Sequence, residues 1–496
     1  MSRTTKLLLG VIAAAVVFAA LAGGLFVTIR LLEILFDPNA VDPANVVQCR
    51  DSAGCSIVHP ILFGIIFVFV IITGFAYTTL LERKFIAWFQ QRVGPNRVGP
   101  LGLLQPAADA VKLIFKEDII PDRADKFVYY LAPLLKTIPA VIVVAVVPIG
   151  PNILVPWFDG LIYNVPLSVA GDINIGILWL LAITSLGTYG VTLAGWSSNN
   201  KYAMLGGLRA SAQMISYELS LGLTMAVPIM IVGSMSLVDI VEAQKYVQDW
   251  FVFQNPLAAG ILILALFAEV SRAPFDLVEA EQELTAGFMT EYSGMKFAMF
   301  MMAEYIGMIV VSMIVASLYF GGYHFILVDQ APILGPVVMI AKVVLFLIFF
   351  IWVRSTLPRI RYDRLMALGW KVLLPLSLLA VSWTAVALVI GDSSESPLTY
   401  TVASGIFFVL TLAGGFYFLR ERPEEGAQAQ DDLANDPLIS GERKGVAWTL
   451  LNLLGGLVAV PFLLVEGVIK ALEGAERAGK PASEETAIVP KESAGD

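Results

Sequence analysis

Carboxylates gather at one place in the sequence, directly after an apolar run suited to a lipid bilayer. The stretch 268–294, AEVSRAPFDLVEAEQELTAGFMTEYSG, contains a single arginine, Arg272. Around it lie seven carboxylates: Glu269, Asp276, Glu279, Glu281, Glu283, Glu291 and, a little further on, Glu304. Crowded carboxylates raise one another's pKa, so that some of them can exchange protons near neutral pH. The stretch therefore predicts either a proton-exchanging site or an acidic docking surface for a basic partner.

The spacing of the central glutamates favours an irregular loop. In a helix, Glu279 and Glu283 would share a face while Glu281 would point away from it. A loop that lines a wet cavity fits this triplet better than a regular helix that faces lipid.

Three charged residues stand inside apolar segments: Glu218, Glu304 and Lys342. If a helix resumes at Leu208, Glu218 lies about 15 Å along it, near the middle of a membrane. Charged groups at that depth are costly and usually mark an ion or proton path. Taken singly, each also fits a structural ion pair or a side chain that reaches toward the membrane surface.

The segment 82–121 combines basic residues with a Gly/Pro-rich elbow. From Pro106 to Lys116 the apolar residues share one side of a helix while Asp109 lies off it, as expected for a helix in the membrane surface. This helix is either an interfacial anchor or a doorway that admits an amphiphile from the lipid.

The composition requires a membrane to position these residues. The chain is 57% hydrophobic and 15% charged, with a mean hydropathy of +0.78, whereas roughly a quarter of the residues in soluble proteins are charged. Because unpaired backbone groups are costly in lipid, each long apolar segment should be a helix. The sequence predicts an all-α polytopic membrane protein with segments near 7–32, 60–81, 128–150, 173–195, 212–234, 256–269, 297–320, 331–353, 372–391, 400–419 and 446–469.

The basic loops predict the orientation. The segments 82–126 and 354–371 hold eight and five Lys and Arg, whereas 151–172 and 321–330 hold none. By the positive-inside tendency, the basic loops and the acidic stretch face the cytoplasm. Arg3 and Lys6 could open a signal peptide, but the long apolar run favours an uncleaved helix. Cys49 and Cys55 then lie outside, either as a disulfide or as two free thiols.

Four blocks resemble the quinone-pocket membrane subunit of respiratory complex I, the H subunit of bacterial NADH:quinone oxidoreductase. They read ERKFIAWFQQRVGPNRVGPLGLLQPAADAVKLIFKED, GWSSNNKYAMLGGLRASAQMISYE, RAPFDLVEAEQELTAGFMTEYSGMKFAMFMMAEY and LPRIRYDRLMALGWKVLLPL. The resemblance covers about 59–391 and implies the family's eight-helix core. Residues 1–58 would add a transmembrane helix and an external loop, and 392–496 a C-terminal extension with one or two further apolar helices and an acidic tail. The segment 446–469 either spans the membrane or lies in its surface.

The resemblance implies roles by motif. A quinone tunnel would involve Glu82, Arg83, Arg92, Asp109, Arg272 and Asp276. Proton or charge coupling would involve Glu218, Glu269, Glu279, Glu281, Glu283 and Glu304, to which we add the buried Lys342. Arg361 and Asp363 would lie in the last cytoplasmic loop.

The same resemblance implies how the chain works with others. Quinone would be the substrate, while iron–sulfur clusters and flavin would belong to partner subunits, so that no catalytic group or metal belongs to this chain alone. The partners would be the membrane-arm and peripheral-arm subunits of complex I in a bacterial-type inner (plasma) membrane, with lipid and quinone but no nucleic acid.

Two alternatives remain from the sequence. One is the equivalent subunit of a membrane-bound hydrogenase or a ferredoxin-linked complex, because the electron donor lies outside this chain. The other is a self-sufficient ion transporter with the same buried carboxylates. The sequence does not distinguish ubiquinone from menaquinone.

Overall fold

The computed structural model describes residues 46–49, 53–156, 162–276, 286–325 and 334–394, and the single positions 328, 332, 405, 406 and 409. The predicted segments 7–32 and 446–469 lie outside these residues, as does most of 400–419. Glu279, Glu281 and Glu283 also lie outside them. The extra terminal helices and the central acidic triplet therefore stay predictions.

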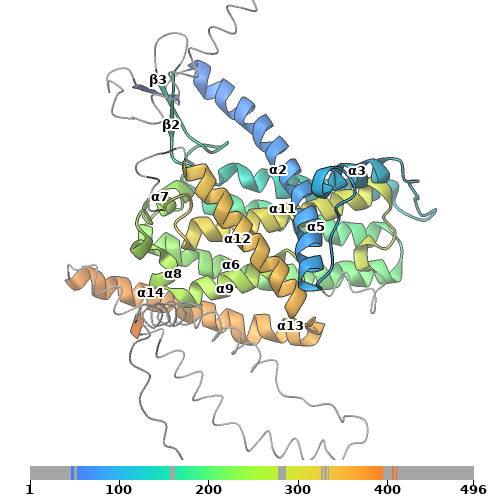
Figure 1. The fold of residues 1–496 in the computed structure, drawn as a ribbon. Coiled ribbons are helices and arrows are strands. Elements are labelled where there is room, and N and C mark those ends of the chain that lie inside the picture. The colour runs from blue at the N-terminus through green and yellow to red at the C-terminus, as the bar shows by residue number, and fades with distance from the viewer. Residues whose placement is uncertain are drawn as a thin grey trace, which may run out of the picture. The chain divides into compact units, whose positions relative to one another are not determined.

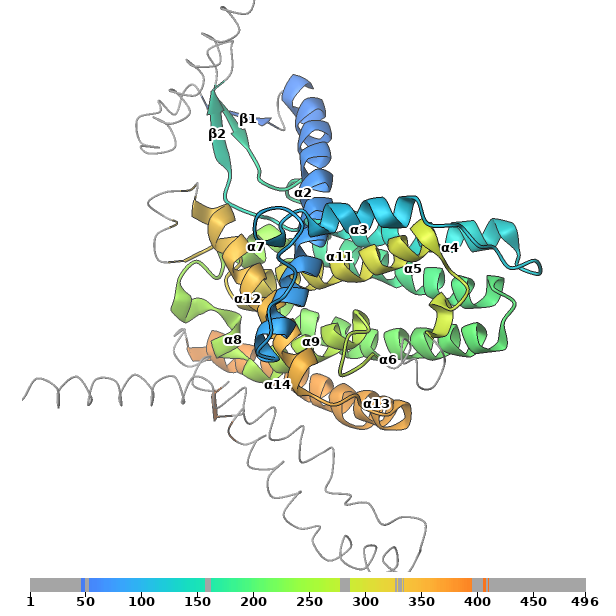
Figure 2. The ribbon, with the colours of Figure 1, turned by 45° about the vertical axis from the view of Figure 1, so that its right-hand side comes forward.

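Long helices make up most of the described part, which confirms the all-α polytopic membrane fold. Seven are long and apolar enough to cross a membrane. They are α2 (Ala53–Phe89), α4 (Lys126–Ile142, continued by a 3-10 turn at Val143–Val146), α5 (Gly176–Ser197), α6 (Lys201–Val232), α11 (Gly294–Tyr319), α12 (Leu334–Thr356) and the run formed by α13 (Tyr362–Leu368), a π turn (Gly369–Leu373) and α14 (Leu374–Ser394). Figures 1 and 2 show α2 crossing α6, α9 and α11 at a steep angle.

An eighth apolar helix, α9 (Pro256–Glu269), has only 14 residues. It is about 21 Å long, whereas crossing the hydrocarbon core takes roughly 20 residues. With α9, the described residues hold all eight apolar segments predicted between 60 and 391. Shorter pieces connect them: α3 (Gln105–Ile114), α7 (Leu237–Glu242), α8 (Phe251–Gln254) and 3-10 turns at Pro100–Gly102, Val247–Asp249 and Gly287–Met289.

Helix α6 begins earlier than expected, so the predicted start at Leu208 is wrong. The helix starts at Lys201, because the Asn200 side chain caps it by accepting a hydrogen bond from the amide two residues on, at 3.0 Å. Gly206 stays helical within this added part. Glu218 consequently lies about 26 Å from the start of the helix, close to the midpoint of its 32 residues. Glu218 is thus near the middle of a longer helix, and its depth in a membrane stays a prediction.

A small sheet, which the sequence did not predict, lies near the start of α2. Its central strand β3 (Ile162–Val165) pairs antiparallel with β2 (Ile153–Pro156) and parallel with β1 (Val46–Gln48). Cys49 follows β1 directly and forms a disulfide with Cys55 in the first turns of α2. Strands of three or four residues are too short to show a hydrophobic alternation, so no periodicity could reveal them.

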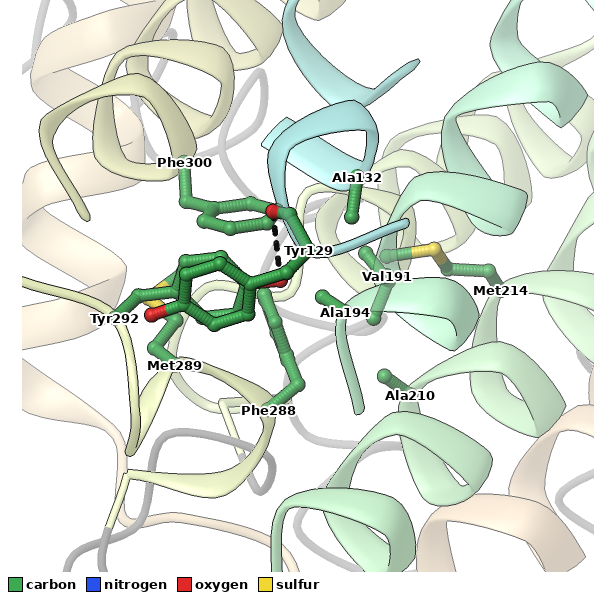
Figure 3. Close-up of a cluster of buried hydrophobic side chains, with 10 residues drawn as sticks. All are labelled: Tyr129, Ala132, Val191, Ala194, Ala210, Met214, Phe288, Met289, Tyr292 and Phe300. Carbon is green, nitrogen blue, oxygen red and sulfur yellow. Dashed lines mark hydrogen bonds between the residues drawn. The ribbon is translucent and has the colours of Figure 1, made fainter. Parts of the chain in front are cut away.

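An aromatic cluster joins the start of α4 to the residues that lead into α11 (Figure 3). Tyr129 and Tyr292 stack with their ring centroids 4.3 Å apart, and Phe300 meets Tyr292 edge-on at 4.9 Å. The Tyr129 hydroxyl donates to the backbone carbonyl of Glu291 at 2.6 Å, so this polar group is satisfied. The cluster fixes the position at which the chain enters α11.

Glycines allow the helices to approach closely. A Cβ atom added at Gly190 of α5 would lie 2.7 Å from the backbone nitrogen of Lys136 on α4. One added at Gly206 of α6 would lie 2.6 Å from the Cα of Gly287. In both cases the neighbour is backbone, which cannot move aside as a side chain can. Small residues at helix contacts are the usual means of close packing in membranes.

We expect Gly206→Ala to lower the melting temperature of the purified protein, because over-packing of a tight contact costs about 1–3 kcal/mol. The matched control is Gly222→Ala on the same helix, where an added Cβ would meet nothing within 4 Å. This control should melt at or slightly above the wild-type temperature, since alanine favours the helix over glycine. Thermal denaturation in detergent measures both; equal melting temperatures for the two variants would contradict the tight contact.

Candidate functional site

The early end of α9 creates an irregular, buried segment. After Glu269 the chain leaves the helix, and residues 270–276 are all buried although they form no regular helix. At membrane depth such a backbone is tolerated only inside protein or beside a wet cavity. The segment brings Arg272 and Asp276 into the interior, where their side chains are 4% and 3% exposed.

Gln213 of α6 holds this segment in place. Its side-chain nitrogen donates to the carbonyl of Ala268 at 2.8 Å and to that of Phe275 at 3.2 Å. The two acceptors lie on either side of the irregular residues, so one fully buried amide fixes both ends. A second bond joins the segment to the residues after α12, where the Ile360 amide donates to the carbonyl of Pro274 at 3.0 Å.

Arg272 meets α11 at two neighbouring residues. Its guanidinium lies 3.6 Å from a carboxylate oxygen of Glu304 and 4.2 Å from the centre of the Tyr305 ring. Both members of the ion pair are buried, at 4% and 6% side-chain exposure. Removal of one partner from a buried pair leaves an uncompensated charge, which is strongly destabilising. The pair therefore fixes Arg272 and Glu304 as a unit.

Arg272 is the only arginine in the acidic stretch, but it is not the only cation that pairs with the buried carboxylates. This corrects the expectation from the local sequence. Arg359 lies 3.4 Å from Asp276, and Arg354 forms an ion pair with Glu82, which is 4% exposed near the end of α2. Both cations come from the end of α12 and the residues after it. Sequence reasoning had counted these arginines only as markers of orientation, because nothing in a linear pattern pairs residues 272 positions apart.

A cavity of about 70 Å³ opens beside the ion pair. Its lining includes Lys136 of α4, Thr184 of α5, Glu269 at the end of α9 and Glu304 of α11. A single water needs roughly 10–15 Å³ of such space and two to four polar partners. The cavity therefore has room for a short chain of waters between charged groups. Among the described residues, one buried carboxylate oxygen of Glu269 has no hydrogen-bond partner.

The remaining charge of this region is on α6. Glu218 accepts a hydrogen bond from the Ser185 hydroxyl at 2.6 Å and lies within electrostatic range of Glu269. Glu218, Glu269 and Glu304, predicted from separate segments, are thus brought to one region of the bundle. Lys136 belongs to the same region and was missed. A lysine inside the apolar segment 128–150 is the same signal that singled out Lys342, so the sequence did contain it.

Lys342 lies apart from this cavity. Its ammonium donates to the carbonyls of Phe320, Gly322 and His324 at 2.6, 2.8 and 2.9 Å and lies 4.5 Å from the Trp250 ring centre. These acceptors directly follow α11, where unpaired carbonyls attract a cation. These contacts fit the structural alternative for Lys342, and its place in coupling stays an untested prediction.

The residues expected at the tunnel entrance and the last loop are more exposed. Arg83 pairs with Asp109 of α3 at 2.6 Å, which ties this helix to α2. Arg92 donates to the nearby side chain of Gln90 at 2.7 Å. Arg361 and Asp363 pair with each other at 3.2 Å on the surface. None of these five residues lines the cavity. No residue of α3 is buried, as its predicted place at a membrane surface would require.

Known proteins match the region that holds these charges. A family model described as "NADH dehydrogenase" matches residues 62–385. An NADH-quinone oxidoreductase H subunit of Geobacter sulfurreducens is 49% identical over 325 residues, which are 65% of this chain and 94% of that protein. The chain belongs to this H-subunit family. The family region spans α2 to most of α14 and includes every charged residue described above.

Two further members agree with this assignment. An NADH-quinone oxidoreductase H subunit of Syntrophobacter fumaroxidans is 51% identical over 310 residues, 62% of this chain and 89% of that protein. Its counterpart of the same name in Deinococcus radiodurans is 46% identical over 354 residues, 70% of this chain and 85% of that protein. The family assignment therefore rests on nearly the full length of each relative. Cys49 and Cys55 precede the residues matched by the family model.

A second polar region lies near the disulfide, in a cavity of about 870 Å³ lined in part by Cys49, His59, Glu242 and Tyr323. The Tyr323 hydroxyl donates to Glu242 at 2.5 Å, and the His324 ring lies 3.5 Å from its other oxygen. The polar contact with His324 holds the pKa of Glu242 below its ordinary value. Partial burial opposes this shift, and the hydrogen bond from Tyr323 supports it.

Acidification should weaken this cluster. Because folding lowers the pKa of Glu242, its contribution to stability is present above the ordinary value of 4.5 and is lost as the pH falls through the lowered value. We expect the wild-type melting temperature to drop below about pH 4.5 more steeply than that of Glu242→Gln, which cannot titrate. Thermal denaturation across this range provides the measurement, and parallel curves for the two proteins would count against the role of Glu242.

Proposed function

We propose that this chain is the membrane subunit of a proton-translocating NADH:quinone oxidoreductase, in which it forms a wall of the quinone site and couples quinone reduction to proton translocation. The main support is a series of charges inside a bundle of the H-subunit family: Asp276, Arg272 and Glu304, which are buried, followed by the half-buried Glu269 and Glu218. The names of the relatives favour NADH over hydrogenase-linked partners.

The charges are suited to coupling because they do not balance. If all were ionised, the three carboxylates Glu218, Glu269 and Glu304 would exceed the two cations Lys136 and Arg272 by one. Isolated charge is expensive at membrane depth, which favours the retention of one proton among the carboxylates. A proton held in this way can move when the surrounding charge changes.

The irregular segment offers a place where that change could begin. Arg272 and Asp276 occupy one buried segment, and Arg272 contacts Glu304 on the cavity. Reduction of a quinone beside this segment would change the local charge, and the Arg272–Glu304 pair would respond because Coulomb interactions are strong where water is excluded. In this proposal the effect of quinone reduction passes from the quinone, through the irregular segment, to the cavity.

The proposal assigns the redox chemistry to other subunits. Quinone would be the substrate, and the iron–sulfur clusters and flavin would lie in partners of the membrane arm and the peripheral arm. The complex would occupy the bacterial inner (plasma) membrane, with quinone entering from the lipid. The glutamates Glu279, Glu281 and Glu283 remain part of the proposed coupling route.

A photoreactive quinone analogue tests the binding half of the proposal. In the assembled complex it should label residues within 82–115 or 268–305, and excess quinone should compete with the label. The isolated chain should be labelled much less, because one wall of the site is proposed to come from the partners. Equal labelling of the isolated chain would overturn the shared site.

Glu269→Gln tests the coupling half, since the change removes a titratable proton and almost no volume. We expect quinone reduction per assembled complex to fall by roughly tenfold or more, in line with the loss of a proton-transfer group, and the proton yield per electron pair to fall with it. The matched control is Glu242→Gln, which lies outside the proposed route and should keep wild-type turnover at neutral pH. Normal turnover and proton yield in Glu269→Gln would end the coupling role of this residue.

A further inference from the structure

The half-buried Lys136 is held differently from the other lysines inside the bundle. The only hydrogen bond that its ammonium makes in the described residues is to the sulfur of Met214, at 4.0 Å, and a thioether is a weak acceptor. It forms no ion pair within 4.0 Å in that part of the chain. By contrast, Lys296 lies 2.8 Å from Asp118, and Lys342 donates to three carbonyls.

The surroundings leave Lys136 room to move. A Cβ atom added at Gly187 of α5 would lie 3.6 Å from its Cδ and 3.8 Å from its Nζ, so the bare glycine backbone borders the path of the side chain. The ammonium lines the cavity together with Glu269 and Glu304, and it lies within electrostatic range of both. A flexible four-carbon stem can therefore turn toward either carboxylate without moving a helix.

We propose that Lys136 carries protons between Glu269 and Glu304 across this cavity, directly or through water. This inference rests on the coupling function proposed above and adds to it the residue that connects the two carboxylates. Glu269 supplies a second observation, because one of its buried oxygens has no hydrogen-bond partner in the part of the chain that the structure describes. The weakly held ammonium of Lys136 and this carboxylate oxygen of Glu269 thus belong to residues that line the same cavity.

The proton balance of the transfer is simple. The Lys136 ammonium gives one proton to the Glu304 carboxylate, which leaves a neutral amine and a neutral carboxylic acid. A protonated Glu269 then gives its proton to the Lys136 amine, which restores the ammonium and leaves Glu269 ionised. The net result is one proton moved from Glu269 to Glu304, with total charge unchanged, and the reverse order moves it back.

Arginine and methionine at this position separate proton transfer from charge compensation. Lys136→Arg keeps the positive charge, but a guanidinium does not release its proton in a protein, whereas Lys136→Met removes both. We expect both variants to lose roughly tenfold or more in quinone reduction per assembled complex. Lys371→Arg is the control, because this lysine does not line the cavity and lies outside the proposed quinone site, and it should keep wild-type turnover. Wild-type turnover and proton yield in Lys136→Arg would overturn the proposal, because charge alone would then suffice.

A small amine provides the second test. Lys136→Ala leaves a space next to the cavity, and added methylamine should restore part of its quinone reduction in the detergent-solubilised complex, while tetramethylammonium, which carries no transferable proton, should not. Absence of rescue by methylamine, or failure of the arginine, methionine and alanine variants alike to assemble, would assign Lys136 to folding and overturn the proposal. Loss of activity in Glu269→Gln with normal activity in Lys136→Arg would reject this inference alone, whereas normal activity in both would reject the coupling function itself.

Discussion

The structure of the site depends on a helix that stops too soon. Helix α9 ends after 14 residues, and the chain must continue through the interior without the hydrogen bonds of a helix. Its backbone groups need partners from other helices, which Gln213 supplies at both ends of the segment. These bonds hold Arg272 and Asp276 in the interior, at 4% and 3% exposure, where each lies close to an opposite charge.

Those opposite charges arrive from distant parts of the chain. Glu304 reaches Arg272 from α11, and Arg359 reaches Asp276 from the residues after α12. Each pair is close enough to hold its members in fixed positions. Glu269 and Lys136, which border the same cavity as Glu304, form no ion pair within 4.0 Å in the described part of the chain. The ion pairs of Arg272 and Asp276 are thus fixed, whereas Glu269 and Lys136 beside them are held loosely. A change of charge at the fixed pairs can then move a proton between the loosely held groups.

The sequence predicted what hydropathy and single buried charges can report. The eight segments between 60 and 391 follow from apolar length alone, and the charge of Glu218 inside an apolar helix follows from the composition around it. Partner choice is not local, however, and the ion pair of Glu82 with Arg354 could not be deduced from either segment.

The start of α6 and the short strands could not be predicted for a different reason. The start of α6 depends on the cap at Asn200, and a single capping residue is a weaker signal in a sequence than a run of polar residues. The strands of the sheet are too short to show an alternation of apolar and polar residues. For Lys342 the apolar surroundings were evident from the sequence, but the three carbonyls that accept its hydrogen bonds became visible only in three dimensions.

The length of α2 ties the molecule to its membrane. A helix of 37 residues is about 55 Å long, almost twice the roughly 30 Å of a hydrocarbon core. At an inclination of about 40°, the upper end of the usual range, it would cover about 42 Å, the full thickness of a bilayer with its headgroups. In a thinner membrane the helix would tilt more, and in a thicker one it would tilt less. Glu82, near the C-terminal end of α2, pairs with Arg354, and Arg359 in the residues that follow pairs with Asp276. A change of helix tilt with lipid thickness would therefore act on the segment that holds both arginines.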